Sequence, residues 1–200
     1  MHLREHLVIL LVSPFLLSST VLSQHGGPIA PGAAVERLAT GYTFLEGSTA
    51  DTYGNIYFTD IPTERIFRST PADGITLYRE NTNQANGLSF DPDGRLIICQ
   101  MKTRRITAIG LDGNGASIAD RYGERRFNSP NDLWIDQSGG VYFTDPRYGA
   151  TDDIELDGNH VYYITPVTNN IVQVTTNLVR PNGLVGTTDG RRLYVADHGG

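Results

Sequence analysis

The chain has 200 residues, 39% hydrophobic and 19% charged, with a net charge of −6 at pH 7, which is typical of a globular protein that buries a core. Its basic residues form no cluster longer than a pair, so the sequence lacks the basic stripe that a nucleic-acid partner requires. Twenty-two glycines, ten tyrosines and seven phenylalanines favour short strands joined by tight turns.

Residues 1–23 have the order of a secretory signal peptide. Arg4 precedes the apolar stretch LVILLVSPFLL, and small residues follow it as far as Ser23. The stretch is too short for a stable membrane span and contains Pro14. No cysteine directly follows it, so we expect no lipid anchor. The order predicts an exported protein, periplasmic or secreted; a buried N-terminal helix is the alternative.

Residues 24–34 (QHGGPIAPGAA) are rich in Gly, Pro and Ala and have no hydrophobic period, so we interpret them as a linker. Cys99 is the only cysteine, which excludes a disulfide within the chain. Its place in the apolar run LIICQ predicts a small buried hydrophobic residue.

From residue 41 onward a unit of roughly fifty residues recurs, which indicates a repeat architecture. In each unit an acid or amide is followed eight residues later by a glycine and then by an apolar strand. The four pairs are Glu46 and Gly54, Asn86 and Gly94, Asn131 and Gly139, and Asn182 and Gly190. Period-2 alternation in IYFTD and VYFTD predicts that each unit is a β-sheet.

Each unit reads as four short antiparallel strands: one that bears the acid or amide, one of the YFTD type, and two outer ones. Such sheets repeated about an axis form a β-propeller, so the predicted fold is all-β. We expect an incomplete propeller domain over 35–200, with about three and a half blades. The predicted blades are about 41–80, 81–120, 126–176 and a partial one at 178–200. Residues 35–40 (VERLAT) have no predicted partner, so we expect them to pair with sequence beyond this chain.

In a propeller, residues at one register point toward one place, so the four acid and amide side chains should converge. They offer oxygen ligands, which hard cations such as Ca²⁺ prefer, and a single carboxylate would leave the cation a usable Lewis acid. No thiolate or imidazole shares this register, which argues against a closed structural zinc site. Asn86-Gly87 and Asn182-Gly183 are also common turn dipeptides, and a plain turn is the alternative for each.

Other candidate sites have weaker support. The sequence has no GxSxG motif for a serine nucleophile. The acidic stretch from Asp153 to Gly158 resembles the start of an EF-hand, but Ile164 stands where that loop needs Glu, so we expect an exposed acidic loop. His198 is a candidate proton shuttle or a half-exposed blade histidine, and His160 is expected at the surface.

The chain resembles the gluconolactonase/regucalcin (senescence marker protein) family of six-bladed propellers. The resemblance runs from about Val35 to His198 and is carried by LEG (45–47), ANGLSFDPDGRLIIC (85–99), NSPNDL (128–133), YFTDPRYG (142–149), RPNGL (180–184) and LYVADH (193–198). It implies one divalent cation on the axis, calcium first, with zinc, magnesium or manganese as alternatives, and hydrolysis of small-molecule lactones.

Carried over by position, the resemblance implies that Glu46, Asn131 and Asn182 are metal ligands and that Asn86 lines the substrate pocket. The family's fourth ligand, an aspartate given the proton-transfer role, would lie beyond Gly200, so these 200 residues alone are expected to be inactive. Residues 48–50 (Ser-Thr-Ala) depart from the family's Pro-Val-Trp after LEG.

Two functions follow from different classes. The first is a metal-dependent lactone hydrolase in which the cation acts as a Lewis acid. The second is a non-catalytic propeller that holds protein partners, because IYFTD and VYFTD are close to the YWTD strand of receptor propellers. The axial acid and amides favour the enzyme, since a binding propeller has no need of them.

Overall fold

The structure is a computed structural model that describes residues 8–9, 30 and 32–199, and every regular element in this part is a β-strand. The predicted signal peptide lies outside the described residues apart from Val8–Ile9, which form strand β1. Of the predicted linker, Ala30 and residues 32–34 are described, and they are exposed. A search of the described residues for a helix long and apolar enough to cross a membrane finds none.

Three sheets each contain four strands in sequence order, so every strand pairs with the one before it. The first sheet consists of β2 (Leu45–Ala50), β3 (Ile56–Asp60), β4 (Arg65–Thr70) and β5 (Gly74–Glu80). The second consists of β6 (Ala85–Phe90), β7 (Leu96–Gln100), β8 (Arg105–Ile109) and β9 (Gly115–Ala119). The third consists of β12 (Leu133–Ile135), β13 (Val141–Asp145), β14 (His160–Ile164) and β15 (Ile171–Thr175). All pairings are antiparallel, as predicted.

The fourth sheet contains β16 (Pro181–Gly186) and β17 (Leu193–Asp197), with β1 paired in parallel to β17. A small hairpin of β10 (Arg121–Tyr122) and β11 (Arg125–Arg126), which the sequence did not reveal, lies between the second and third sheets in the chain. Residues 35–40 form no strand and are exposed. Within the described chain they pair with nothing.

The glycine eight residues after each acid or amide ends a tight turn between the first two strands of a sheet. Gly54, Gly94, Gly139 and Gly190 all have positive φ, between 67° and 84°, which other residues rarely adopt. In the first three turns an aspartate opens the turn; Asp51 Oδ1, for example, accepts the backbone N–H groups of Tyr53 and Asn55. The predicted turn glycines are thus confirmed.

The core lies between consecutive sheets rather than inside any one of them. Ile66 of the first sheet packs with Leu88 and Ile98 of the second, and Cys99 packs with Phe143 of the third in another cluster. A third cluster joins the third sheet to Leu184 and Val195 of the fourth. Cys99 is fully buried, as predicted.

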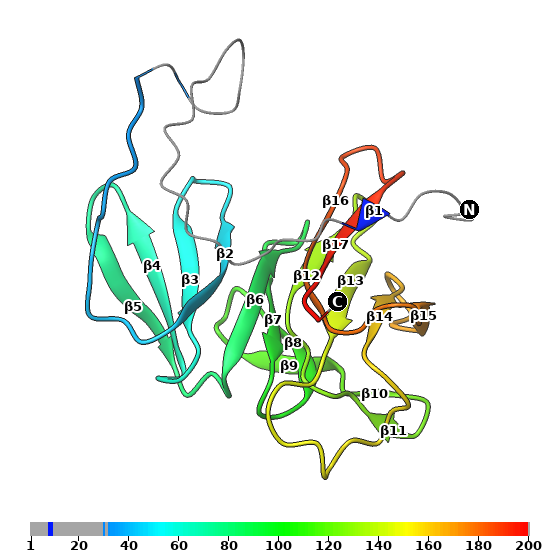
Figure 1. Ribbon diagram of the computed structural model, residues 1–200. Helices are drawn as coiled ribbons and strands as arrows, with labels where there is room; N and C mark the ends of the chain where they lie inside the picture. Colours follow the sequence, from blue (N-terminus) through cyan, green and yellow to red (C-terminus); the bar gives the residue numbers. More distant parts are fainter. Residues whose placement is uncertain (1–7, 10–29, 31, 200) are drawn as a thin grey trace.

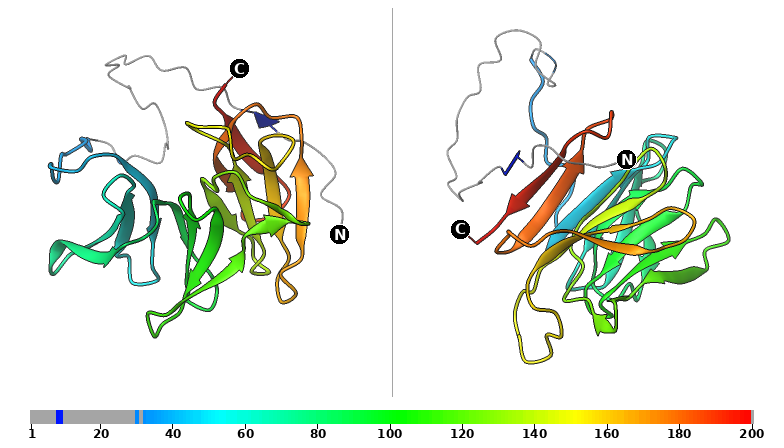
Figure 2. Two further views of the ribbon diagram at one scale, coloured as in Figure 1. Left: turned by 90° about the horizontal axis from the view of Figure 1, so that it is seen from below. Right: turned by 90° about the vertical axis from the view of Figure 1, so that its right-hand side faces the viewer.

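The sheets follow one another as a fan, each stacked against the next (Figure 2). Their first strands lie toward the middle of the molecule, with β5 at one side and β15 at the other (Figure 1). This arrangement confirms the predicted all-β architecture. It also places Glu46, Asn86 and Asn182 on inner strands and Asn131 just before one.

Candidate functional site

The four acid and amide residues, called here the ring residues, occupy one register of the inner strands. Glu46, Asn86 and Asn182 are each the second residue of their strand. Asn131 stands two residues before β12, and its N–H donates to the carbonyl oxygen of Thr144 at 2.9 Å, which continues the β12–β13 ladder.

The strand is irregular at each of three ring residues. The pairing register shifts between Glu46 and Thr49, between Ala85 and Leu88, and between Pro181 and Leu184. A bulge of this kind bends a strand and turns a side chain away from the ladder. The bulges therefore give these ring residues a direction that regular strands would not.

A glycine follows three of the ring residues. Two of these glycines, Gly47 and Gly87, allow the backbones of neighbouring inner segments to approach closely. A Cβ built on Gly47 would lie 1.8 Å from the carbonyl oxygen of Asn86, and one on Gly87 would lie 2.7 Å from Cα of Asp132. The N–H of Gly87 donates to the carbonyl oxygen of Asn131 at 2.7 Å. Asn86-Gly87 and Asn182-Gly183 thus lie within β6 and β16, so the alternative of a plain turn does not hold for either dipeptide.

Asp132 stands where the other three repeats have glycine. Its Oδ2 accepts the N–H of Leu184 at 3.0 Å, and its Oδ1 lies 2.7 Å from the position of a Cβ on Gly87. The Asp132 carboxylate therefore lies between the inner strands of the second and fourth sheets. Asp132 was not among the predicted site residues, although the replacement of Gly by Asp in one repeat is a readable signal.

The carboxyl groups of Glu46 and Asp132 are near enough for the charge of one to act on the other. Burial raises the pKa of Asp132 above its ordinary value, although the N–H bonds from Leu184 and Leu133 oppose that effect. Burial also raises the pKa of Glu46, and the negative charge of Asp132 adds to it. Two carboxyl groups that repel each other in a partly buried place favour a bound cation, which would hold both in the ionised form.

The side chains of the ring residues differ in their partners. Asn131 is 5% exposed, and within the described residues its amide makes no hydrogen bond, whereas Asn86 Nδ2 donates to Met101 Sδ at 3.6 Å and Asn182 Nδ2 donates to Tyr148 Oη at 2.7 Å. Buried amides normally have partners, so Asn131 is available to a guest. No side-chain partner of Glu46 exists in the described chain either.

A carboxylate at the end of the second strand fixes the segment that leads into the ring. Asp145 accepts the backbone N–H groups of Asn128 and Ser129, each at 2.8 Å, just before Asn131. One side chain thus fixes the backbone of Asn128 and Ser129, which lie three and two positions before Asn131. Asp60 and Asp197 hold the equivalent pairs, which are Thr43 with Phe44 and Val179 with Arg180.

These aspartates are the last residue of IYFTD, VYFTD and LYVAD, and each follows its ring residue by fourteen or fifteen positions. In the second sheet Gln100 takes the place of aspartate, and its Nε2 donates to the carbonyl oxygen of Thr82 at 3.0 Å. From the sequence, the YFTD motif was interpreted only as a β-strand. Its repeated acid was the missed sign of a positioning role.

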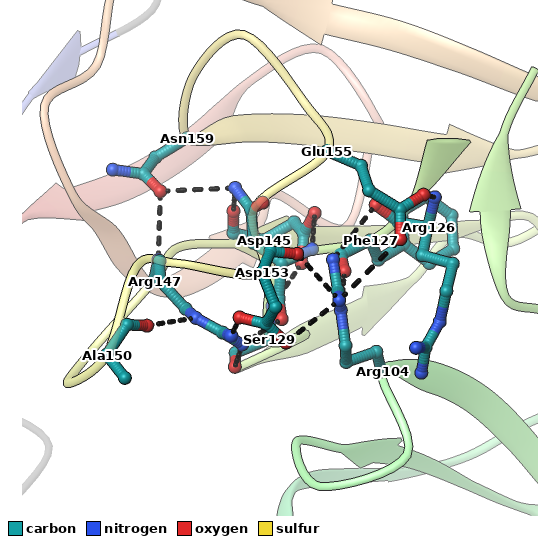
Figure 3. Close-up of polar contacts among 11 residues, drawn as sticks. Arg104, Arg126, Phe127, Ser129, Asp145, Arg147, Ala150, Asp153, Glu155 and Asn159 are labelled. Atoms are coloured by element: carbon teal, nitrogen blue, oxygen red, sulfur yellow. Dashed lines mark hydrogen bonds and ion pairs between the residues drawn. The ribbon is translucent and has the colours of Figure 1, made fainter. Parts of the chain in front are cut away.

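The loop from residue 146 to residue 159 is fastened by two arginines (Figure 3). Arg104, 3% exposed, donates Nη1 to the Asp153 carboxylate at 3.1 Å, and Arg147 pairs with the same carboxylate. Arg147 Nη1 also donates to the carbonyl oxygen of Asn128 at 2.8 Å and to Ser129 Oγ at 3.2 Å. The acids of the stretch from Asp153 to Gly158 are exposed, as predicted, whereas its Leu156 is buried in the core, and Asp153 pairs with both arginines.

The two histidines singled out by the sequence have different environments. His160 is 5% exposed and its Nε2 lies 3.0 Å from Asp157 Oδ1, so the expectation of a surface position was wrong. It begins β14 beneath the 146–159 loop, which covers it. His198 is exposed, its backbone N–H donates to the carbonyl oxygen of Arg180 at 2.9 Å, and its ring centroid lies 6.4 Å from that of Tyr148.

No group of three or more His, Cys, Asp or Glu side chains suited to a metal occurs among the described residues. The ring residues do not form such a group because three of the four are amides. Their donors are nevertheless those that Ca²⁺ accepts, namely amide carbonyl and carboxylate oxygens. That the side-chain oxygens of Glu46, Asn131 and Asn182 lie within about 5 Å of one another, as a shared cation requires, stays a prediction.

The four-stranded antiparallel sheets, stacked side by side, define a β-propeller, as predicted. Residues 44–198 match the family model described as the SMP-30/gluconolactonase/LRE-like region, and the chain belongs to this family. The resemblance inferred from the sequence is thereby confirmed.

Two curated relatives are named as lactone-hydrolysing enzymes. A gluconolactonase of Zymomonas mobilis is 32% identical over 183 residues, covering 82% of this chain and 51% of that protein. The lactonase drp35 of Staphylococcus saprophyticus is 31% identical over 161 residues, covering 76% and 48%. The chain thus spans about half the length of these relatives.

Among solved structures, a gluconolactonase of Xanthomonas campestris is similar, with a TM-score of 0.75 and 29% sequence identity. The match covers 80% of this chain and 56% of that one. The similarity therefore extends from sequence to the arrangement of the sheets.

Proposed function

We propose that the protein hydrolyses lactones, as the names of its gluconolactonase and lactonase relatives suggest, with a divalent cation at the ring residues. The observation that supports the proposal is the common register of Glu46, Asn131 and Asn182 in or just before the inner strands of a chain of this family. The unpartnered amide of Asn131 and the carboxyl pair of Glu46 and Asp132 support a cation there. Calcium fits the all-oxygen donor set best.

Glu46, Asn131 and Asn182 would hold the cation through one carboxylate and two amide oxygens. A cation bound in this way supplies Lewis-acid polarisation of the lactone carbonyl and stabilises the developing oxyanion. Asn86 would line the pocket beside the substrate. One of its two Nδ2–H groups donates to Met101 Sδ, which leaves Oδ1 and the second N–H for a substrate hydroxyl.

The chain's other residues orient this set. Asp60, Asp145 and Asp197 hold the backbone before the three ligands, which limits their movement. The inner strands are irregular at Glu46 and at Asn182, where the pairing register shifts, and such a bulge redirects a side chain. No observation favours the alternative of a purely protein-binding propeller.

The test is lactone hydrolysis by the full-length protein, with gluconolactone as the probe. Removal of divalent cations by a chelator should abolish activity, and added calcium should restore it. Asn131→Ala and Glu46→Gln should each reduce the rate by about 100-fold or more, the usual effect of losing one stabilising electrostatic group.

His198→Ala is the contrasting variant, because the exposed His198 side chain makes no hydrogen bond within the described residues. It should retain most of the activity. Full activity in the presence of chelator would overturn the cation assignment. A His198 variant less active than the Glu46 variant would instead indicate histidine-based chemistry.

A further inference from the structure

Tyr148 contacts a ring residue from a loop and not from an inner strand. It belongs to the 146–159 loop between β13 and β14, and its Oη accepts a hydrogen bond from Asn182 Nδ2 at 2.7 Å. The two residues are 34 positions apart in the chain, so the contact is made by tertiary structure.

The tyrosine side chain is held on more than one side. The guanidinium carbon of Arg180 lies over its ring, 5.3 Å from the ring centroid. The neighbouring Arg147 fastens the loop through Asp153 and the lead-in segment before Asn131 (Figure 3). The Tyr148 hydroxyl is therefore a fixed group and not a mobile surface side chain.

An asparagine amide has two ends of nearly equal shape, and only the oxygen end can bind a cation. When Oδ1 binds a cation, the Nδ2–H bonds become more positive and need an acceptor. The Tyr148 hydroxyl supplies that acceptor at 2.7 Å, and this leaves Oδ1 of Asn182 without a protein partner among the described residues.

We propose that Tyr148 is a positioning residue that orients the Asn182 amide so that its carbonyl oxygen faces the cation. This inference rests on the proposed function of the ring. The inference goes beyond that function because it assigns a role to the 146–159 loop. The cation affinity would then depend on Tyr148, a side chain that does not itself touch the cation.

The test is calcium affinity measured by isothermal titration calorimetry on the full-length protein. Tyr148→Phe should weaken calcium binding about fivefold, the effect of losing one neutral hydrogen bond. At saturating calcium the hydrolysis rate should recover. Tyr163→Phe is the matched control, because Tyr163 Oη donates to Asp136 Oδ2 at 2.8 Å, an equally short hydrogen bond made away from the ring. It should leave calcium affinity unchanged.

A second background separates orientation from packing. In Asn182→Asp either carboxylate oxygen can bind the cation, so no orientation is needed. The Tyr148 hydroxyl could then only donate to the carboxylate and draw charge away from the cation. Tyr148→Phe should therefore cause no loss of affinity in this background, whereas a packing role would cause the same loss in both.

Equal losses in the two backgrounds, or wild-type affinity in Tyr148→Phe, would overturn the role of Tyr148 and leave the proposed function standing. A wild-type protein that binds no calcium and hydrolyses no lactone would overturn the proposed function, and the inference with it. Unfolding temperatures of Tyr148→Phe and Tyr163→Phe, measured together, show whether a loss of fold contributes.

Discussion

The buried carboxyl group of Asp145 has a structural role. It is fully buried and accepts two backbone N–H groups, those of Asn128 and Ser129. Burial raises its pKa to about 7, and the N–H bonds and the charges of Arg104 and Arg147 only partly oppose this. A side chain that fixes the entrance to the ring is thus also sensitive to pH.

The sign of this effect follows from the raised pKa of Asp145. The folded protein binds the proton more tightly than the unfolded chain does, so the contribution to stability is complete below the ordinary pKa of an aspartate. It is lost as the pH rises through about 7. We predict that the free energy of unfolding, measured by urea denaturation, falls between about pH 4 and 7 by a few kcal/mol on this account.

Asp145→Asn should flatten that part of the profile, at the cost of one hydrogen bond. Asp112→Asn is the control, because the pKa of Asp112 is shifted in the opposite direction to that of Asp145. Hydrogen bonds from Asn114 hold the pKa of the exposed Asp112 below its ordinary value, so its contribution is present above that value and lost as the pH falls. An Asp145→Asn profile with the wild-type slope would contradict the assignment.

At the level of strands, the approach of the inner strands depends on glycine. Gly87 donates its N–H to the carbonyl oxygen of Asn131, and a Cβ at this position would lie 2.7 Å from Cα of Asp132 and 2.8 Å from that carbonyl oxygen. Both obstacles are backbone atoms, so β6 and the segment before β12 would have to separate. A methyl group at Gly87 would therefore push apart β6 and the segment before β12.

Gly183 provides a matched comparison for Gly87. It also follows a ring asparagine, but its Cβ would lie 3.6 Å from Asp132 Oδ2, which is ordinary contact. We predict that Gly87→Ala lowers the free energy of unfolding by about 2 kcal/mol, as overpacking does, and that Gly183→Ala lowers it much less. Thermal and urea unfolding measure both. Equal losses would show that steric contact between the inner strands is not the cause.

On the scale of the whole molecule, the packing of the sheets brings two like charges within reach of each other. Glu46 comes from the first sheet, Asp132 from the segment that begins the third, and Leu184 of the fourth sheet fixes the Asp132 carboxylate by its N–H. The repulsion between the two carboxyl groups opposes assembly of the sheets. A cation bound there would stabilise the arrangement of all the sheets as well as the reaction.

We predict that calcium raises the unfolding temperature of the full-length protein and that chelation lowers it. A ligand at 100 times its dissociation constant stabilises the folded state by about 2.7 kcal/mol. Asp132→Asn should narrow the difference between the calcium-loaded and chelated states, because one of the two repelling charges is removed. Differential scanning calorimetry checks this. A difference as large as in the wild type would show that Asp132 does not sense the cation.

The sequence by itself determined the repeat, the all-β propeller fold, the turn glycines and the common register of Glu46, Asn86, Asn131 and Asn182. These features are local: period-2 alternation and a positive φ at glycine depend on a few neighbouring residues. The repeat then transfers them along the chain, which is also why the family resemblance was visible from short motifs.

Only the tertiary structure decided what surrounds those residues. The hydrogen bond from Asn182 to Tyr148, the place of Asp132 between two inner strands, and the burial of His160 each join segments through folding or through a covering loop. Neither hydrophobic period nor turn chemistry encodes such contacts. The repeat in the sequence therefore sets the register of the ring residues. The orientation and charge of their side chains depend on how the sheets pack together.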